Sequence, residues 1–272
     1  MRWLITTDGS SHAQRAARFA ASLLRPGQDE IVLLGVTSRR DKQTVLAALG
    51  EIESKYPELV KEQIVQEGPM AKVIEKVAFS KPFDLAVYAS RGRRGLKKMI
   101  LGSVAAKLAL EMPCSVLIIR QIPKELKSIL IATTLSLEHH HPIREGMRLA
   151  ALTNAEVTLL HVMSQVTLQD HEFAEQLELN ADEAITQHTR EGLGFEHMLK
   201  HAEEFGVKAN SLIRYGLVED EIIGEVAEGQ YDLLVMGAHR PALNQSWESL
   251  LIEDVASTVL IDTRCPIMIV RK

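Results

Sequence analysis

The residues best suited to chemistry lie in a basic, glycine-rich segment, 89–104, which reads ASRGRRGLKKMILGSV. Gly92, Gly95 and Gly102 permit positive φ and let backbone N–H groups approach an anion closely. Gly102 and Ser103 open a predicted helix, whose first turn presents free N–H groups and the positive end of the helix dipole. Five cations accompany them: Arg91, Arg93, Arg94, Lys97 and Lys98. The segment therefore predicts a phosphate cradle. The alternative is a tight turn followed by a solvated basic helix face.

A carboxylate, Asp8, follows an apolar run at residues 3–7 that is typical of a strand. At the carboxyl end of a strand, Asp8 could accept hydrogen bonds from a ribose or a base. It could equally cap a helix expected at Ser10–Leu24, which Pro26 and Gly27 would stop.

These residues belong to the first of two copies of one sequence pattern. The runs at 3–8 and 30–36 return 126 positions later, at 129–134 and 156–162. The run at 84–89 returns 148 positions later, and the run 114–120 returns 151 positions later. The order is unchanged and the offset only grows, so we interpret the chain as a tandem duplication.

The repeated runs are short and rich in Val, Ile and Leu, which is typical of parallel strands buried on both faces. Helical patterns alternate with them, for example at 71–79 and 103–110. This alternation predicts an α/β fold with two tandem, doubly wound, Rossmann-like domains, each with a five-stranded parallel sheet. Ligands of such sheets bind beyond the carboxyl ends of the strands, so the loops after Thr7, Val36 and Ala89 are the candidate sites.

We place the domains at 1–122 and 126–272, joined near Pro123. The growing offset puts 22 extra residues in the second copy between Val162 and Gly216. They fall in a polar stretch, Asp170–Arg190, where a helix of about six turns is expected. Its apolar spacing runs through Phe173, Leu177, Ala181, Ala184, Ile185 and His188. Gly192-Leu193-Gly194 is expected to break it before a second helix that ends at Phe205.

The order of these blocks, with Asp8 and the glycine-rich loop, resembles the universal stress protein family across nearly the whole chain. Nucleotide-binding members carry G-x-x-G, nine residues, then G-[S/T]. Gly92, Gly102 and Ser103 fit that spacing, whereas Ala89 replaces the first glycine. A methyl group there could crowd the ribose or a phosphate, or be accommodated by a small shift.

The resemblance implies a site for ATP or another adenine nucleotide in the first copy, with Mg²⁺ as a candidate companion ion. Asp8 and Val36 match the adenine and ribose end, and Gly92, Gly102, Ser103 and Val104 match the phosphate end. Ala89 and Arg91 complete the candidate cofactor-binding residues. It also implies that the last strands of the two copies pair antiparallel, which would make the chain an intramolecular pseudo-dimer, open to further homodimerisation. That pairing would separate Cys114 from Cys265, so no disulfide is expected between them.

The second copy departs from the phosphate-binding pattern. Thr134 stands at the position of Asp8, and Arg240-Pro241 stands where the second motif glycine would be. Aligned back from Cys265, Glu253-Asp254 replaces Gly102-Ser103 at the expected start of a helix, where two carboxylates would repel a triphosphate. We expect no nucleotide in this copy.

Composition bounds the remaining possibilities. The chain has 272 residues, 46% hydrophobic and 25% charged, with a net charge of −5, which argues against a general nucleic-acid binder. No apolar run is long enough to span a membrane, and two cysteines make no disulfide framework, so we expect a reduced, cytoplasmic protein. The histidines at 139–141 lack the ligand spacing of a metal site, His161 is expected as a satisfied core residue, and Trp247 is expected to pack in the core.

Three functions remain open at this point. The first is a stress-response sensor or regulator that binds an adenine nucleotide, at most hydrolysing ATP slowly. The second is a nucleotide-independent scaffold, or a binder of a protein partner or small apolar ligand, that uses the degenerate second copy. The third is an enzyme with adenylate chemistry, against which stands the absence of any nucleophile–base–orienter motif in the sequence.

Overall fold

The computed structural model describes residues 1–38, 41–89, 109, 111–135, 141–164, 179–237 and 247–271, with only the backbone of 247–254. The chain divides into two compact units, one formed by 1–122 with 266–269 and the other by 123–265 with 270–272.

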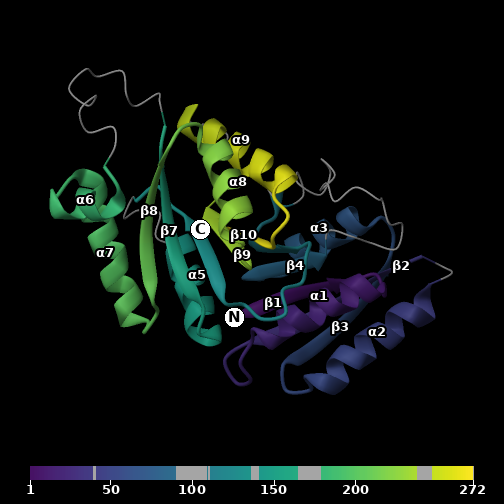
Figure 1. The fold of residues 1–272 in the computed structure, drawn as a ribbon. Helices are drawn as coiled ribbons and strands as arrows, with labels where there is room; N and C mark the ends of the chain where they lie inside the picture. The colour runs from purple at the N-terminus through teal and green to yellow at the C-terminus, as the bar shows by residue number, and fades with distance from the viewer. Residues whose placement is uncertain are drawn as a thin grey trace. The chain divides into compact units, whose positions relative to one another are not determined.

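The first unit alternates strands and helices as the sequence predicts (Figure 1). Its elements are β1 (Arg2–Thr7), α1 (Ser11–Ser22), β2 (Glu30–Thr37), α2 (Lys42–Lys55), β3 (Val60–Glu67), α3 (Met70–Ser80), β4 (Leu85–Ala89) and β5 (Ser115–Ile119). The strands are parallel in the order β3-β2-β1-β4-β5. Because the chain steps outward from β1 to β3 and then returns to β4, the strand order reverses between β1 and β4.

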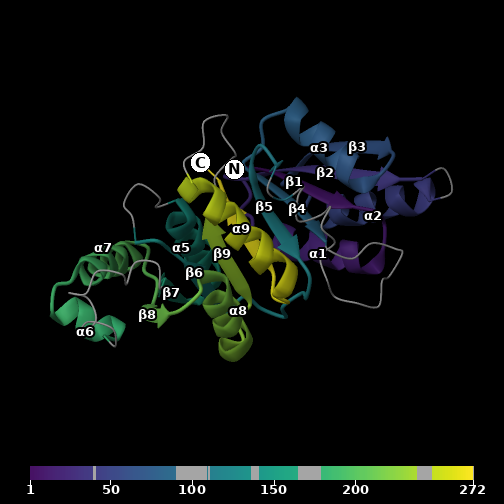
Figure 2. The same ribbon diagram turned by 90° about the horizontal axis from the view of Figure 1, so that it is seen from above.

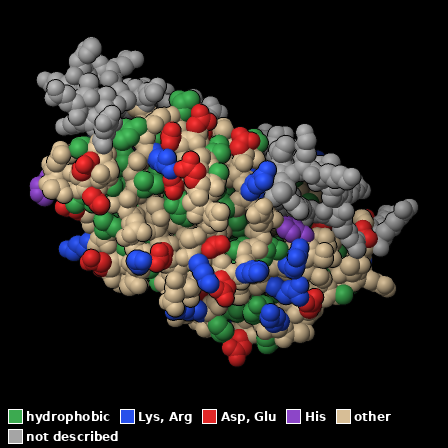
Figure 3. Space-filling view, in the orientation of Figure 1, with side chains coloured by type: hydrophobic (Ala, Val, Ile, Leu, Met, Phe, Trp, Pro, Cys, Tyr) green, Lys and Arg blue, Asp and Glu red, His purple; other side chains and the backbone are tan. Residues whose placement is uncertain are grey.

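Helices cover both faces of this sheet (Figure 2). Helices α1 and α2 lie on one face and α3 on the other, as right-handed crossovers require. Helix α1 begins as predicted, because the Ser10 hydroxyl accepts a hydrogen bond from the N–H of Ala13 at 3.2 Å. Its outer side carries Arg15 and Arg18, where Figure 3 shows Lys and Arg side chains gathered.

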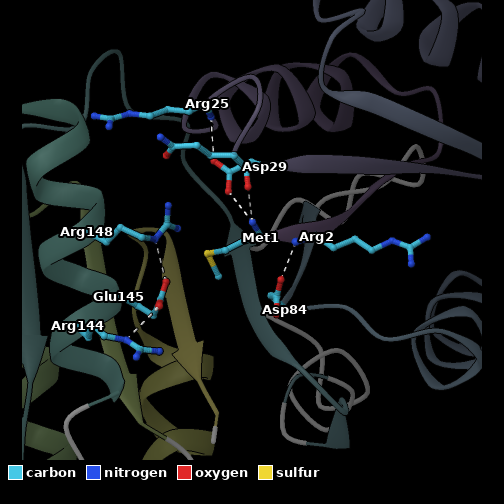
Figure 4. Close-up of polar contacts among 9 residues, drawn as sticks. Met1, Arg2, Arg25, Asp29, Asp84, Arg144, Glu145 and Arg148 are labelled. Atoms are coloured by element: carbon cyan, nitrogen blue, oxygen red, sulfur yellow. Dashed lines mark hydrogen bonds and ion pairs between the residues drawn. The ribbon is translucent and has the colours of Figure 1, made fainter.

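A polar cluster fixes the amino end of the same sheet, opposite the candidate site (Figure 4). The Met1 amine lies 2.9 Å from a carboxylate oxygen of Asp29, and the other oxygen accepts from the N–H of Arg25. The N–H of Arg2 donates to Asp84 at 2.6 Å. These contacts join the starts of β1, β2 and β4.

The last strand of the chain, β10 (Ile267–Val270), lies antiparallel to β5, with Met268 beside Leu117. This is the pairing that the resemblance implies. Because the two strands run in opposite directions, Cys114 and Cys265, which precede them, are at opposite ends of the pair; both are buried.

The second unit has parallel strands in the order β9-β6-β7-β8. Its elements are β6 (Ser128–Ala132), α5 (His141–Thr153), β7 (Glu156–Met163), α6 (Ala181–Thr186), α7 (Arg190–Glu204), β8 (Ala209–Tyr215), α8 (Val218–Gly229), β9 (Leu233–Gly237) and α9 (Trp247–Asp262). In α5, the buried Glu145 accepts from the Nε of Arg148 at 3.1 Å (Figure 4).

The predicted six-turn helix at Asp170–Arg190 is wrong where the structure describes it. Helix α6 ends at Thr186, and His188 has a φ of 53°, which no α-helix contains. The residues 165–178 lie outside the described part of the chain. The break therefore falls before Thr189, which caps α7 by accepting from the N–H of Gly192.

The expectation that Gly192-Leu193-Gly194 breaks a helix is also wrong, since both glycines lie within α7. A Cβ on Gly192 would stand 2.0 Å from the carbonyl oxygen of Ala184 in α6. The glycine is therefore required by the close approach of two helices rather than by a turn.

Glu253 and Asp254 are likewise not at a helix start. Helix α9 already runs from Trp247, so both lie within it. Residues 247–252 contain neither glycine nor proline, so they are compatible with helix. Because a helix dipole acts mainly within the first and last turn, these two carboxylates do not stand where they would meet the positive end of the dipole of α9. The side chains of Trp247, Glu253 and Asp254 are outside the description.

Candidate functional site

The candidate site lies at the carboxyl edge of the first unit's sheet, where the strand order reverses. Thr7, the last residue of β1, is beside Gly35 of β2, and Ile5 is beside Val87 of β4. Adjacent strands are about 4.8 Å apart. Asp8, Val36 and Ala89 therefore come from the ends of three neighbouring strands.

Asp8 is held in a tight turn. One carboxylate oxygen accepts from the N–H of Ser10 at 2.9 Å, and the N–H of Gly9 donates to the Thr7 hydroxyl at 3.1 Å. Gly9 has a φ of 76°, a conformation that favours glycine. The helix cap, the alternative role of Asp8, is made by Ser10. The Asp8 side chain is half-buried and fixed in orientation, as a ligand-binding carboxylate should be.

Val36 is buried near the end of β2, with 5% of its surface exposed. Beyond the strand, the Ser38 hydroxyl donates at 2.8 Å to Asp41, the residue before α2. The end of β2 thus offers an apolar side chain and backbone groups, which suit the flat, weakly polar surface of a base.

Ala89 is the half-buried last residue of β4, beside Ile119 of β5. The preceding residue, Tyr88, is buried, and burial raises the pKa of its phenol. The predicted phosphate end, Arg91, Gly92, Gly102, Ser103 and Val104, lies outside the described residues. The structure therefore brings together Asp8, Val36 and Ala89 of the predicted site.

The second copy keeps the turn but changes its chemistry. The Thr133 hydroxyl accepts from the N–H of Leu135 at 3.0 Å, and Leu135 has a φ of 58°, close to that of Gly9. Thr134, in place of Asp8, is exposed and carries no charge.

His161 is a satisfied, partly buried residue, as the sequence predicts. Its Nδ1 lies 2.9 Å from the carbonyl oxygen of Thr133, and burial lowers the pKa of the imidazole. The hydrogen bond to a carbonyl requires a proton on Nδ1. His161 thus ties β7 to the end of β6.

Sequence reasoning missed the role of Gly35, which stands in an otherwise apolar strand. A Cβ on Gly35 would lie 2.5 Å from a methyl of Val45 in α2. A lone glycine inside a strand pattern indicates such a close approach, and that signal was available.

Neither a metal centre nor a membrane span appears in the part of the chain that the structure covers. No three His, Cys, Asp or Glu side chains there are grouped to hold an ion. No helix there is long and apolar enough to cross a bilayer. His139 and His140 lie outside that part, while His141 and Pro142 begin α5.

Comparison with known proteins identifies the family. The model of the universal stress protein family matches residues 1–120 and again 125–271, so the chain belongs to this family as a tandem member. Universal stress protein MJ0531 of Methanocaldococcus jannaschii is 27% identical over 142 residues, 45% of this chain and 83% of that protein. Two crystal structures share the fold over 99% of the chain. A putative universal stress protein from Pseudomonas aeruginosa UCBPP-PA14 has a TM-score of 0.70 at 17% identity, with 92% of it covered. A universal stress protein from Archaeoglobus fulgidus DSM 4304 has a TM-score of 0.64 at 16% sequence identity, with 98% of it covered.

Proposed function

We propose that this universal stress protein binds ATP or a related adenine nucleotide in its first copy and acts as a cytoplasmic stress-response sensor or regulator. The observation that carries the proposal is the placement of Asp8. Its carboxylate is oriented by a backbone N–H at the point where the strand order reverses, and the glycine-rich sequence follows the next strand of the sheet.

The described residues fit the ribose and base end of such a ligand. One oxygen of Asp8 accepts from Ser10, and a carboxylate has further lone pairs with which to accept from ribose hydroxyls. Val36 and the end of β2 would contact the base. The glycines and cations of 91–103 would receive the phosphates, a role that rests on their sequence and spacing. The phosphates of a bound nucleotide would carry negative charge, to which Mg²⁺ could bind.

The second copy would not bind nucleotide. Thr134 offers no carboxylate, and the carbonyl of Thr133 already receives the imidazole of His161. We therefore expect one nucleotide per chain.

Calorimetry on nucleotide-free protein tests the proposal. ATP, AMP and cAMP are the probes; cAMP is included because one universal stress protein, similar to about half of this chain, is described in complex with it. ATP or AMP should bind with a stoichiometry of one per chain. Absence of binding by all three nucleotides would overturn the proposal and leave a nucleotide-independent scaffold.

The variant Asp8→Asn keeps an acceptor for the Ser10 N–H but removes the charge. A hydrogen bond to a charged group contributes about 1.5–3 kcal/mol, so the affinity should fall about 10-fold to 100-fold. Thr134→Ala changes the matching position of the second copy and should leave the affinity unchanged. If the two variants changed the nucleotide affinity equally, Asp8 would not be a nucleotide-binding residue.

A further inference from the structure

Helix α2 rests directly on backbone next to two of the candidate site residues. A Cβ built on Gly9 would stand 3.2 Å from the backbone of Thr44, and one built on Gly35 would stand 2.5 Å from Cγ1 of Val45. Gly9 follows Asp8 in the chain, and Gly35 precedes Val36. Near the ends of β1 and β2 the chain therefore contacts the first turns of α2 through glycine backbone, because neither Gly9 nor Gly35 has a side chain. We call these two positions the two-glycine contact.

The second copy lacks the two-glycine contact. Leu135 replaces Gly9 and His161 replaces Gly35, at the offset of 126 that relates these strands. The residue that faces Leu135 on the helix side is Gly194 of α7, which leaves space for the leucine side chain. A Cβ built on Gly194 would stand 2.9 Å from the Cβ of Leu135. The His161 imidazole is bound to the Thr133 carbonyl. Both copies thus fill the strand–helix space, but only the first fills it with strand backbone at both points.

This difference has a mechanical consequence. Protein interiors are close-packed, so a shift of one contacting group is passed to its neighbour. Long side chains can absorb a small shift by changing rotamer, whereas the backbone of Gly9 meets the backbone of Thr44 and that of Gly35 meets Val45, a β-branched side chain with little rotamer freedom in a helix. A ligand that draws Asp8 or Val36 toward itself would move Gly9 and Gly35, and α2 would have to follow.

Helix α2 also reaches the surface. Its inner side is buried through Val45, Ala48, Leu49 and Ile52, while Leu46, on the outer side of the same turns, is 44% exposed. A small change in the position of α2 would therefore alter a surface that another molecule can contact.

We infer that α2 is the element through which nucleotide occupancy of the first copy is passed to the protein surface. This inference rests on the proposed function and adds the regulation of the same site. In the second copy α7 lies against Leu135 instead, so the contact that would carry the movement is missing.

Hydrogen exchange measured by mass spectrometry tests the inference. Peptides from α2 (42–55), α3 (70–80) and α7 (190–204) are compared without nucleotide and with ATP at a concentration that calorimetry shows to be saturating. Exchange in α2 should slow by about threefold or more on binding, with α3 and α7 unchanged. If ATP binds and α2 does not respond more than α3 and α7, the inference is overturned. If ATP does not bind at all, the proposed function itself has failed.

Two glycine variants, one in β2 and one in α2, test the same contact. Gly35→Ala places a methyl group against Val45 and should displace α2. Because coupling between sites is reciprocal, it should weaken ATP binding by about threefold or more, although Gly35 is not a ligand contact. Gly50→Ala, on α2 itself with nothing within 4 Å, should leave both affinity and exchange response as in the parent. Equal affinities for the two variants would contradict the inference. Should Gly35→Ala not fold, the comparison of α2 with α3 and α7 in the parent protein still decides.

Discussion

The second copy contains a charged cluster that makes a sharp test of burial. Arg214 of β8 bonds two carboxylates of α8. The Glu225 side chain is 8% exposed and also accepts from the Tyr231 hydroxyl at 2.7 Å. The Glu228 side chain is 69% exposed and meets Arg214 at 2.8 Å. One arginine thus has a buried and an exposed partner of the same chemistry.

The two carboxylates should differ in what they contribute to stability. Glu225→Ala removes hydrogen bonds to a guanidinium and to a phenol. Burial is the largest factor raising the pKa of Tyr231, to about 12, so the phenol stays a donor in need of an acceptor. Breaking a buried ion pair costs about 3–5 kcal/mol. Arg214 is 34% exposed and retains Glu228, so we expect about 2–3 kcal/mol after allowance for screening. Glu228→Ala should cost about 0–0.5 kcal/mol, as exposed pairs do.

Each copy supplies its own reporter for the measurement. Cys114 belongs to the first unit and Cys265 to the second, and both are buried. Alkylation of each thiol at increasing urea concentration, read peptide by peptide in a mass spectrometer, gives the unfolding of each unit separately. This avoids treating a two-unit chain as one cooperative transition. Glu225→Ala should lower the urea midpoint of Cys265 labelling and leave that of Cys114 unchanged.

The reasoning is refuted if the two glutamate variants lower the Cys265 midpoint equally, because exposure would then not govern the contribution. It is refuted also if Glu225→Ala shifts the free energy of unfolding by less than about 0.5 kcal/mol, the level of an exposed pair.

The structure makes three further predictions. Burial lowers the folded-state pKa of His161 below its ordinary 6.5, so the second unit should keep its full stability above pH 6.5 and lose stability as the pH falls toward the folded pKa. His161→Gln should remove that part of the pH dependence, which urea midpoints measured from pH 7.5 to 5 would show. Two thiols per chain should react under non-reducing denaturation, because Cys114 and Cys265 lie at opposite ends of an antiparallel pair, and a count of zero would contradict this pairing. Gly192→Ala should speed hydrogen exchange in α6 about tenfold, since the methyl group would overlap the backbone of α6. Gly224→Ala, in α8 with open space around it, should raise the free energy of unfolding by about 0.5–1 kcal/mol. Similar effects of the two variants would refute the close approach of α6 and α7.

The central strands could be predicted from the sequence because burial on both faces leaves one readable signature, a short apolar run. The edge strands could not. β3 reads VKEQIVQE and is mostly half-exposed, since an edge strand has a neighbour on one side only. The repeated runs at 3–8, 30–36, 84–89 and 114–120 and their second copies include neither β3 nor the other edge strand, β8. The more buried positions of β3 hold Glu62 and Gln66 as well as Val60 and Ile64, so neither a continuous apolar run nor an apolar–polar alternation marks the strand.

The errors in the second copy have a different origin. Gly192 and Gly194 look like helix breakers because glycine has low helix propensity. In the structure they are inside α7, where tertiary contacts with Ala184 and Leu135 outweigh that propensity. The decisive partners are 8 and 59 positions away along the chain. Local pattern reasoning has no access to such contacts.

Gly9 and Leu135 show how duplicated units can diverge without losing their fold. Both residues have a positive φ and both donate to a threonine hydroxyl two residues earlier, so the turn is fixed by its backbone. The side chain added at 135 is accommodated by the glycine at 194, on the helix that covers it. In the second copy the side chain lies on the strand side of the contact and the glycine on the helix side, whereas in the first copy the glycine is on the strand side, so the space is filled in both.

The same exchange occurs on the other side of the sheet. At the offset of 148, Glu225 and Tyr231 stand where the first copy has Val77 and Phe83. Where the first copy has two apolar residues, the second has a hydrogen-bonded pair, and Arg214 supplies the charge that a buried carboxylate requires. Because packing is maintained by such paired changes, the second copy keeps the turn although Thr134 replaces Asp8, whose carboxylate we propose as a nucleotide-binding group. Restoring a carboxylate there alone, as Thr134→Asp, would therefore return a charge but not the two-glycine contact around it.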